Sequence, residues 1–337
     1  MVAPGRILVV RNDRLGDAVL TLPVIPFLRN KFPDSDFIFW ASPMVAPIIR
    51  CVEGVVGVVE SADDVASSDV LEELKNLNIR TAYCFRPTRS NAMMLLKAGI
   101  TRRIGTARRW YSFLFNDRVN LKRQGSNLHE AELNLMLAGE KDITKTHAFP
   151  KITLPQKFLD TARGLLSAKN IDTSKPYVII HPGSGGSARD WHPDYFRQLS
   201  NSLYSEAGLQ VIVTGGANER EITAQVAGDR HINIAGETDL LALAAVIRDA
   251  ALLVSNSTGP LHLAVALGTK VVGLYPPVKD CLPERWGPYG HYDWAMVAEG
   301  GLCGKCVPGE FSGCACMEKI KPEAVLARCL KVMAEND

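Results

Sequence analysis

Residues 252–274 read LLVSNSTGPLHLAVALGTKVVGL, and this stretch indicates the fold class. The apolar run Leu252–Ser255 has the length of a strand, an apolar helical segment follows Pro260, and Lys270–Leu274 is a second strand-length run. A strand, a helix and a strand in this order form a βαβ unit, whose two strands are parallel. Because both runs are apolar without alternation, each strand is expected to be buried on both faces. We therefore predict an α/β fold.

The same alternation continues in both directions along the chain. Helices are expected over Asp17–Phe32 and Asp69–Leu77, and Pro23 and Pro26 should kink or shorten the first of them. Further strand-length runs occur at Tyr177–His181, Gln210–Thr214 and Ile232–Ile234 in the second half, and at Ile7–Val10, Phe37–Ala41, Val55–Val59 and Thr81–Phe85 in the first.

The chain has 337 residues, of which 47% are hydrophobic and 22% charged. This length exceeds what one hydrophobic core usually organises, so two domains of roughly 150 residues are expected. A short strand-like stretch, a helix near Gln156–Lys169 and a polar loop separate the two series of alternating elements. We predict domains at residues 1–155 and 156–320, with a C-terminal helix in residues 321–337.

The composition narrows the classes of function. A net charge of +2 gives no general argument for nucleic-acid binding. No run reaches the roughly 18 apolar residues of a membrane span, and the apolar stretch Ile7–Val10 is too short for a signal peptide. We expect a cytoplasmic protein.

The loops that follow the strands are the candidate functional segments, because ligands of open parallel sheets bind outside the carboxyl ends of the strands. The first strand leads into RNDRLGD, residues 11–17, which places Asp17 at the start of a helix. At that position Asp17 is either a catalytic general base or a helix cap that satisfies free backbone amides.

Two glycine-rich loops in the second half suit an anionic, hydroxyl-rich ligand. The segment HPGSGGS, residues 181–187, lets backbone amides approach an anion closely, with Arg189 just beyond; the alternative is a tight structural turn. The segment TGGANE, residues 214–219, ends in Glu219, which suits acceptance of hydrogen bonds from sugar hydroxyls or an acidic first helical turn.

The loop SNSTGPLH, residues 255–262, joins a buried strand to an apolar helix that carries an early proline. Free amides at such a helix start suit a pyrophosphate, and Ser257 and Thr258 add hydroxyl donors. His262 lies one turn later on the same side, where it is either a ligand contact or a buried core histidine.

Together these segments resemble glycosyltransferase family 9, the ADP-heptose:lipopolysaccharide heptosyltransferases. The triplet Arg103-Ile104-Gly105 and the segment His129-Glu130-Ala131-Glu132 also look like family landmarks. The resemblance extends from Ile7 almost to the C-terminus, and it depends on the order of ILVVRNDRLGDAVLTLP, HPGSGGSARDWHPDYF, VTGGANERE and SNSTGPLHLAVALGTKVVGLYPP.

The resemblance implies a GT-B-type fold, in which two Rossmann-like domains with parallel sheets face a central cleft. The acceptor would bind residues 1–155 and the nucleotide sugar residues 156–320, and the helix in residues 321–337 would pack back on the first domain. The implied reaction is inverting, metal-independent transfer of a heptose, or a related sugar, from an ADP-sugar to a lipopolysaccharide core acceptor, with no cofactor required.

The predicted site follows from the resemblance and from the loops. Asp17 matches the family's general base, and Thr258, Gly259 and His262 match donor-binding positions. The family often has lysine where Arg189 stands and aspartate where Ser257 stands, which changes the contacts to the donor. We predict that the donor binds Ser184, Ser187, Arg189, Glu219, Ser257, Thr258, Gly259 and His262, and that the acceptor binds Arg11, Asn12, Arg86 and Arg103.

Local charge indicates where an anionic acceptor would lie. Residues 86–123 hold ten basic residues and one acidic residue, with aromatic residues between them. This pattern suits an anionic glycolipid at the inner membrane face, although a solvated basic surface or a single-stranded nucleic-acid site has the same pattern. We expect the glycolipid and no nucleic acid, with the enzyme peripheral to the inner membrane.

The four cysteines Cys303, Cys306, Cys314 and Cys316 are crowded together. They are candidates for a structural zinc site, the alternative being free thiols or a disulfide. We assign them no part in the reaction and predict no catalytic metal.

Two other functions share these features. One is a sugar-nucleotide epimerase of the same fold, and the other is a non-catalytic nucleotide-sugar-binding protein. A nicotinamide-dependent dehydrogenase is disfavoured because no Gly-x-Gly-x-x-Gly follows a strand.

Overall fold

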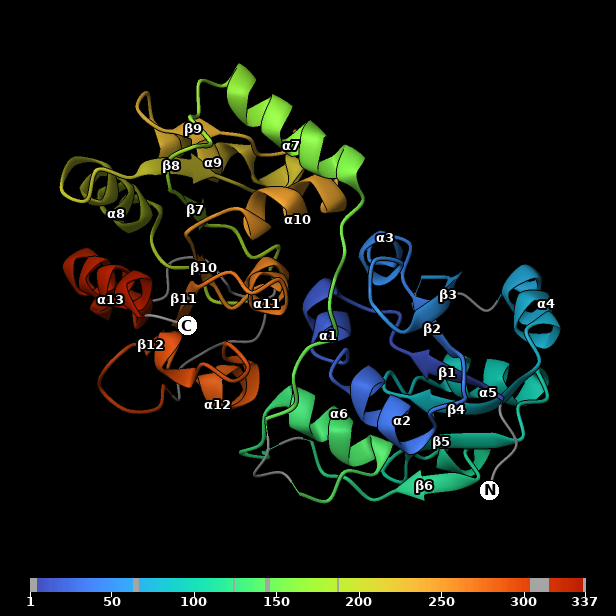
Figure 1. Cartoon of the computed structure of the whole chain (residues 1–337). Helices are drawn as coiled ribbons and strands as arrows, with labels where there is room; N and C mark the ends of the chain where they lie inside the picture. The colour runs from blue at the N-terminus through green and yellow to red at the C-terminus, as the bar shows by residue number, and fades with distance from the viewer. Residues whose placement is uncertain are drawn as a thin grey trace. The chain divides into compact units, whose positions relative to one another are not determined.

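The computed structural model describes residues 5–62, 67–123, 125–142, 146–186, 188–303 and 315–335. The chain divides into two compact units, Met1–Thr153 and Leu154–Asp337. Each unit holds one six-stranded parallel sheet, as the α/β prediction requires (Figure 1).

The strands of the first unit are β1 Arg6–Val10, β2 Phe37–Ala41, β3 Val55–Glu60, β4 Ile79–Cys84, β5 Arg102–Thr106 and β6 Asp117–Val119. Its helices are α1 Leu15–Val19, α2 Val24–Lys31, α3 Ala46–Ile49, α4 Ser68–Asn76, α5 Arg89–Lys97 and α6 Glu130–Ala138, with a 3₁₀ turn, η1, at Ser112–Leu114.

The strands of the second unit are β7 Tyr177–His181, β8 Gln210–Val213, β9 Ile232–Asn233, β10 Leu252–Asn256, β11 Val271–Tyr275 and β12 Ala295–Val297. Its longer helices are α7 Gln156–Ala168, α8 Pro193–Ser205, α9 Arg220–Ala227, α10 Leu240–Arg248, α11 Gly259–Ala266, α12 Pro283–Trp286 and α13 Pro322–Ala334. The 3₁₀ turns are η2 Ala217–Glu219, η3 Lys279–Cys281, η4 Tyr292–Trp294 and η5 Met317–Lys319.

The two sheets have the same topology. The first runs β3-β2-β1-β4-β5-β6, and the second runs β12-β11-β10-β7-β8-β9, so each has the order 3-2-1-4-5-6 when its own strands are counted. This is the doubly wound order, in which the connections leave the first strand and its neighbour, the fourth, in opposite directions. The topology predicts one ligand site per sheet, between β1 and β4 and between β7 and β10.

Strand β1 shows why the sheets are covered on both faces. Leu8 and Val10 belong to a buried cluster with side chains of α4 and α5. Ile7 and Val9 are also buried, and alternation along a strand directs them to the opposite face. An apolar strand without polar positions can therefore exist only with helices on both sides.

The predicted break in the first helix is confirmed. The chain forms α1, turns at residues 20–23 and resumes as α2, with Pro23 at the N-cap of α2. Strands β5, β6 and β12 were not predicted.

The last helix, α13, packs on α8 and β11 within the second unit (Figure 1). Its expected packing on the first domain stays a prediction. Among the described residues, none of the helices combines the length and the apolar character needed to cross a membrane.

Candidate active site

The side chain of Arg11 lies among carboxylates where β1 ends. Its Nε donates to Asp13 Oδ1 at 3.0 Å, and its Nη2 donates to Asp17 Oδ1. Its Nη1 donates to the Phe85 carbonyl oxygen at 3.1 Å and lies 3.4 Å from Glu130 Oε1. Burial alone would lower the pKa of Arg11, but the three negative charges raise it above its usual value. We call Asp13, Asp17 and Glu130 the carboxylate cluster, with Arg11 as its central cation.

Asp17 is the most accessible member of this cluster. It lies in the first turn of α1, and its side chain is 19% exposed. The N-cap of α1 is Arg14, which makes no side-chain capping hydrogen bond. The Asp17 carboxylate contacts Arg11 through one oxygen, and this geometry differs from that of a helix cap.

The other two carboxylates are more deeply buried and were not predicted as site residues. Burial raises the pKa of Asp13, although Arg11 and Arg86 oppose this effect, with Arg86 Nε 3.6 Å from Asp13 Oδ2. Glu130 is 2% exposed and accepts from both Arg11 and Arg123. The cluster therefore carries matching numbers of carboxylates and arginines, as buried charges require.

The residues predicted to bind the acceptor occupy different environments. Arg11 and Asn12 are buried, and Asn12 exchanges side-chain hydrogen bonds of 2.8 and 3.3 Å with Asn91. Arg103 donates to two main-chain carbonyl oxygens, at 2.6 and 2.9 Å. The side chain of Arg86 is 42% exposed. Arg86 thus offers an accessible charge, whereas Arg11 and Asn12 hold the loop together from inside.

In the second unit, Glu219 joins the glycine loops that follow β7 and β8. Its Oε1 accepts from the Gly185 amide at 3.0 Å, and its Oε2 accepts from the Gly216 amide at 2.7 Å. A Cβ at Gly183 would lie 2.1 Å from Glu219 Oε1, so a larger residue at this position would have to displace the Glu219 carboxylate. Glu219 thus fixes both loops while remaining partly exposed.

A buried amide, Asn256, connects the end of β10 to the loop after β7. Its Oδ1 accepts from the Trp191 amide at 2.9 Å, and its Nδ2 donates to the Pro182 carbonyl oxygen at 2.8 Å and to Asp190 Oδ1 at 3.2 Å. Burial, with the charge of Glu219, raises the pKa of Asp190 to about 6, although a hydrogen bond from Ser184 opposes this. Neither Asn256 nor Asp190 was predicted.

Helix α11 begins next to this amide. Its N-cap, Thr258, has extended backbone angles and makes no side-chain capping hydrogen bond, and its Oγ1 lies 3.3 Å from Ser255 Oγ. Gly259 is the first helical residue. Ser257 is partly exposed and hydrogen-bonded to Tyr275. The first amides of α11 therefore have no side-chain cap, as an anion site at a helix start requires.

Of the remaining predicted donor residues, Ser184 and Arg189 lie in the loop after β7, and His262 lies in α11. Arg189 and His262 are 7% and 3% exposed, and Ser184 is partly buried. Ser187 lies outside the described residues, as do Cys306 and Cys314. Cys303 and Cys316 are partly buried, and the zinc site stays a prediction. Within the described ranges, no group of three His, Cys, Asp or Glu side chains could hold a metal ion.

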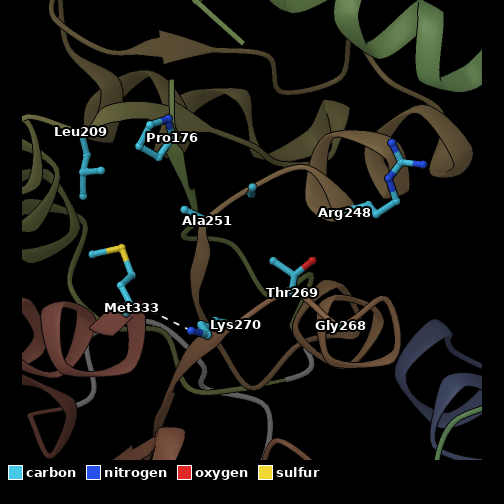
Figure 2. Close-up of a pocket in the computed structure, with 9 residues that line it drawn as sticks. Pro176, Leu209, Arg248, Ala251, Gly268, Thr269, Lys270 and Met333 are labelled. Carbon is cyan, nitrogen blue, oxygen red and sulfur yellow. Dashed lines mark hydrogen bonds between the residues drawn. The ribbon is translucent and has the colours of Figure 1, made fainter. Parts of the chain in front are cut away.

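A cavity of about 470 Å³ lies at the opposite, amino-terminal edge of the second sheet. Figure 2 shows Lys270 there, and its Nζ donates to the carbonyl oxygen of Met333 at 3.5 Å and to that of Glu335. These carbonyls end α13, so Lys270 caps that helix. The cavity precedes β7, β10 and β11 and is not part of the candidate site. It is lined by Pro176, Leu209, Arg248, Ala250, Ala251, Gly268, Thr269, Lys270 and Met333.

Comparison with known proteins identifies the family of this chain. Residues 87–308 match the model of glycosyltransferase family 9 (heptosyltransferase). Lipopolysaccharide heptosyltransferase 2 of Escherichia coli (strain K12) is 26% identical over 310 residues, covering 85% of this chain and 86% of the relative.

Solved structures of known proteins share the fold. A glycosyl transferase of family 9 from Veillonella parvula aligns with a TM-score of 0.82 at 20% identity, covering 98% of each chain. The E. coli ADP-heptose lipopolysaccharide heptosyltransferase II aligns with a TM-score of 0.80 at 21% identity, covering 97% of this chain and 98% of that one. Because the family model covers more than half of the sequence, the chain belongs to glycosyltransferase family 9 and is a glycosyltransferase.

Proposed function

We propose that the protein is an inverting heptosyltransferase that moves a heptose, or a related sugar, from an ADP-sugar to a lipopolysaccharide core acceptor. The observation that carries the proposal is the position of Asp17, a partly exposed carboxylate at the switch point of the first sheet, held through one oxygen by a buried arginine. The family assignment also supports the proposal, because the relatives include enzymes that are named as heptosyltransferases.

Asp17 would act as the general base. The oxygen that Arg11 does not hold can accept the proton of an acceptor hydroxyl while that hydroxyl attacks the anomeric carbon. Attack from the side opposite the leaving diphosphate inverts the configuration. Arg11 remains a cation at any working pH and holds the Asp17 carboxylate in place.

The second unit would bind the donor and stabilise the leaving nucleoside diphosphate. The uncapped amides of α11, the glycine-loop amides after β7 and the Arg189 guanidinium supply hydrogen-bond donors and positive charge. Donors of this kind can take the place of a divalent metal, and no Asp-x-Asp pair follows a strand in the sequence. The proposal is therefore a metal-independent transfer with Ser184, Ser187, Glu219, Ser257, Thr258, Gly259 and His262 around the nucleotide sugar.

The acceptor would be an anionic glycolipid at the inner face of the membrane, approached from the cytoplasm. Arg86 has the accessible charge for its phosphate groups, and it also touches the carboxylate cluster through Asp13. Arg103, which is held by main-chain carbonyls, would support the same surface.

The experiment that tests the proposal measures transfer from ADP-heptose to an inner-core glycolipid, with and without a chelator. Transfer with inversion, undiminished by the chelator, is the expected result. Chelator-sensitive transfer would overturn metal independence. Release of an epimer without acceptor would favour the epimerase, and nucleotide-sugar binding without turnover over a panel of donors and acceptors would favour the non-catalytic protein.

A further inference from the structure

The loop between β5 and β6, residues 107–116, exposes two large apolar side chains. Trp110 is 72% exposed and Phe113 is 67% exposed. Their neighbours Leu114 and Phe115 are 3% and 1% exposed and belong to the core cluster between the sheet and α4–α5. The loop thus buries one set of apolar side chains and presents another to solvent. We call it the aromatic loop.

Hydrogen bonds within the aromatic loop hold its backbone in the conformation that exposes Trp110 and Phe113. The Arg109 amide donates to Ser112 Oγ at 3.0 Å, and the Ser112 amide donates back to the Arg109 carbonyl oxygen at 3.0 Å. The 3₁₀ turn η1 then carries the chain to Phe115, whose ring fills the space where a Cβ of Gly105 would lie.

Positive charge surrounds these aromatic side chains. The Arg89 guanidinium lies 5.4 Å from the centre of the Trp110 ring. Arg108, Arg109 and Arg118 are exposed. The acidic residue of this region, Asp117, is paired with Arg102 at 2.6 Å, so its charge does not neutralise the others.

We propose that the aromatic loop is a docking surface for a lipid bilayer that contains anionic lipids. Tryptophan and phenylalanine gain by entering the interface between headgroups and acyl chains, and arginines beside them meet anionic headgroups. Each arginine near such a surface strengthens binding by about five-fold, because it contributes roughly 1 kcal/mol. The charge of the loop is thus complementary to an anionic membrane.

The position of the loop links docking to the proposed reaction. It follows β5, so it lies at the same edge of the sheet as the loop after β1 that carries Asp17. Tyr111, next to Trp110, donates its hydroxyl to the carbonyl oxygen of Pro87, which adjoins Arg86. Docking would therefore bring this edge of the first unit to the headgroups of a lipid-linked acceptor. This consequence depends on the proposed function, whereas docking itself does not.

The first test measures co-sedimentation of the whole chain with vesicles, without substrates. Vesicles of phosphatidylcholine alone are compared with vesicles that also contain phosphatidylglycerol. The unaltered chain should bind the anionic vesicles, and the double variant Trp110→Ser with Phe113→Ser should bind at least about ten-fold more weakly. Equal binding by the double variant, or no binding by the unaltered chain, would overturn the proposal.

The chain offers a matched control for this double variant. Tyr204 is 50% exposed and has the guanidinium of Arg230 5.8 Å from its ring, but it lies on α8 of the second unit. Tyr204→Ser should leave vesicle binding unchanged. Thermal unfolding of all variants checks folding, and exposed positions should tolerate serine. Equal losses of vesicle binding in the double variant and in Tyr204→Ser would contradict the proposal, because any exposed aromatic residue would then suffice.

The second test separates docking from the reaction. The double variant should keep its turnover on a water-soluble, deacylated acceptor and lose turnover on the same acceptor embedded in vesicles. An equal loss on both acceptors would show that the loop binds the acceptor sugar instead. If neither the unaltered chain nor the double variant transfers sugar, but only the unaltered chain binds anionic vesicles, the proposed function fails and the docking proposal stands. Concentration-dependent dimerisation abolished by the double variant, without vesicle binding, would assign the loop to a second copy.

Discussion

The two sheets have the same strand order, yet their switch points hold opposite chemistry. At the first, three carboxylates are held by three arginines, and Asp17 remains partly exposed. At the second, glycine turns, helix amides and a buried asparagine face the strand ends, with Glu219 and Asp190 tied to amide donors. Topology thus determines where each site lies, and side chains determine what it can do.

This difference fits the proposed reaction, in which the first site supplies a base and the second site binds a leaving diphosphate. A base must be ionised before the acceptor arrives, so its site needs a permanent cation to balance a buried negative cluster. A leaving diphosphate brings its own negative charge, so its site needs free donors in place of carboxylates.

The largest effect is expected at Asp17. Asp17→Asn retains the shape and the contact to Arg11 but removes the base, so turnover should fall about 100- to 10,000-fold. Nucleotide binding, measured by calorimetry, should be unchanged, since the donor loops lie in the other unit. Asp69→Asn is the matched control, because Asp69 is an exposed acid in the first turn of α4, and it should retain full turnover. Undiminished transfer by Asp17→Asn would remove the proposed base.

Arg11→Lys should have the next largest effect. Lysine keeps the charge but cannot hold three carboxylates and a carbonyl with one planar group. Turnover should fall about 10- to 100-fold with little change in the KM of the donor, because the base is misplaced. A purely structural role for Arg11 would instead lower the unfolding temperature without changing kcat of the folded enzyme.

The control for Arg11 is Arg50→Lys. Arg50 pairs with Glu60, but the two side chains are 50% and 36% exposed. Exposed pairs contribute about 0–1 kcal/mol, so both turnover and unfolding temperature should remain close to those of the unaltered chain. Comparable losses in both variants would contradict the special role of the buried cluster.

Gly183→Ala tests the second switch point. The added Cβ would displace the Glu219 carboxylate and break its hydrogen bonds to two loop amides. Donor affinity should fall about ten-fold, since lost hydrogen bonds of this kind cost about 1–2 kcal/mol. Gly164→Ala is the matched control, because Gly164 lies inside α7 with nothing within 4 Å of its Cβ position. It should leave donor affinity unchanged and raise stability by about 0.5–1 kcal/mol.

The sequence predicts the longer apolar strands well and the short or polar strands poorly, such as β12 with three residues. Apolar runs predicted β1, β2, β7 and β10, because a strand with helices on both faces is mostly apolar. The missed strand β5 begins with two arginines, and the missed strand β6 is Asp117–Val119 at the sheet edge. Pairing with a neighbouring strand, and not local composition, makes these segments strands.

The residues of the candidate sites also divide into those that local sequence predicts and those that it does not. Asp17 and Glu219 were predictable, because each follows a strand and a glycine in the chain. Asn256 was not, since its partner Pro182 lies 74 residues away and only the folded sheet brings them together. Glu130 stood in a segment that resembles the family, but its contact to Arg11 spans 119 residues. When a buried polar group bonds to a residue far away in the chain, the sequence around that group does not reveal the partner.

The smallest expected effect concerns the pH dependence of stability at Asp190. Its pKa in the folded chain is about 6, above the ordinary value of 3.8, mainly because of burial. The folded state therefore binds this proton more tightly than the unfolded state, and stability falls as pH rises from about 4 to 6. Asp190→Asn carries no such charge, so it should be more stable than the unaltered chain at pH 7.5 and equally stable near pH 4. The gain should be about 1 kcal/mol, because partial exposure reduces the full effect of a two-unit shift.

Asp172 is the control for Asp190, because its pKa is shifted in the opposite direction. Hydrogen bonds from Ser174 lower the pKa of Asp172, which is exposed. Its carboxylate adds stability above the ordinary pKa and loses it as pH falls, so Asp172→Asn should be less stable than the unaltered chain at pH 7.5 and equal to it in acid. Thermal unfolding midpoints at pH 7.5 and pH 4 measure Asp190→Asn, and midpoints at pH 7.5 and about pH 2 measure Asp172→Asn, because the lowered pKa of Asp172 lies below 3.8. If Asp190→Asn shifted in the same direction as Asp172→Asn, the second switch point would stabilise this buried carboxylate instead of destabilising it. The contrast between the two sites would then rest on Asp17 and its arginine alone.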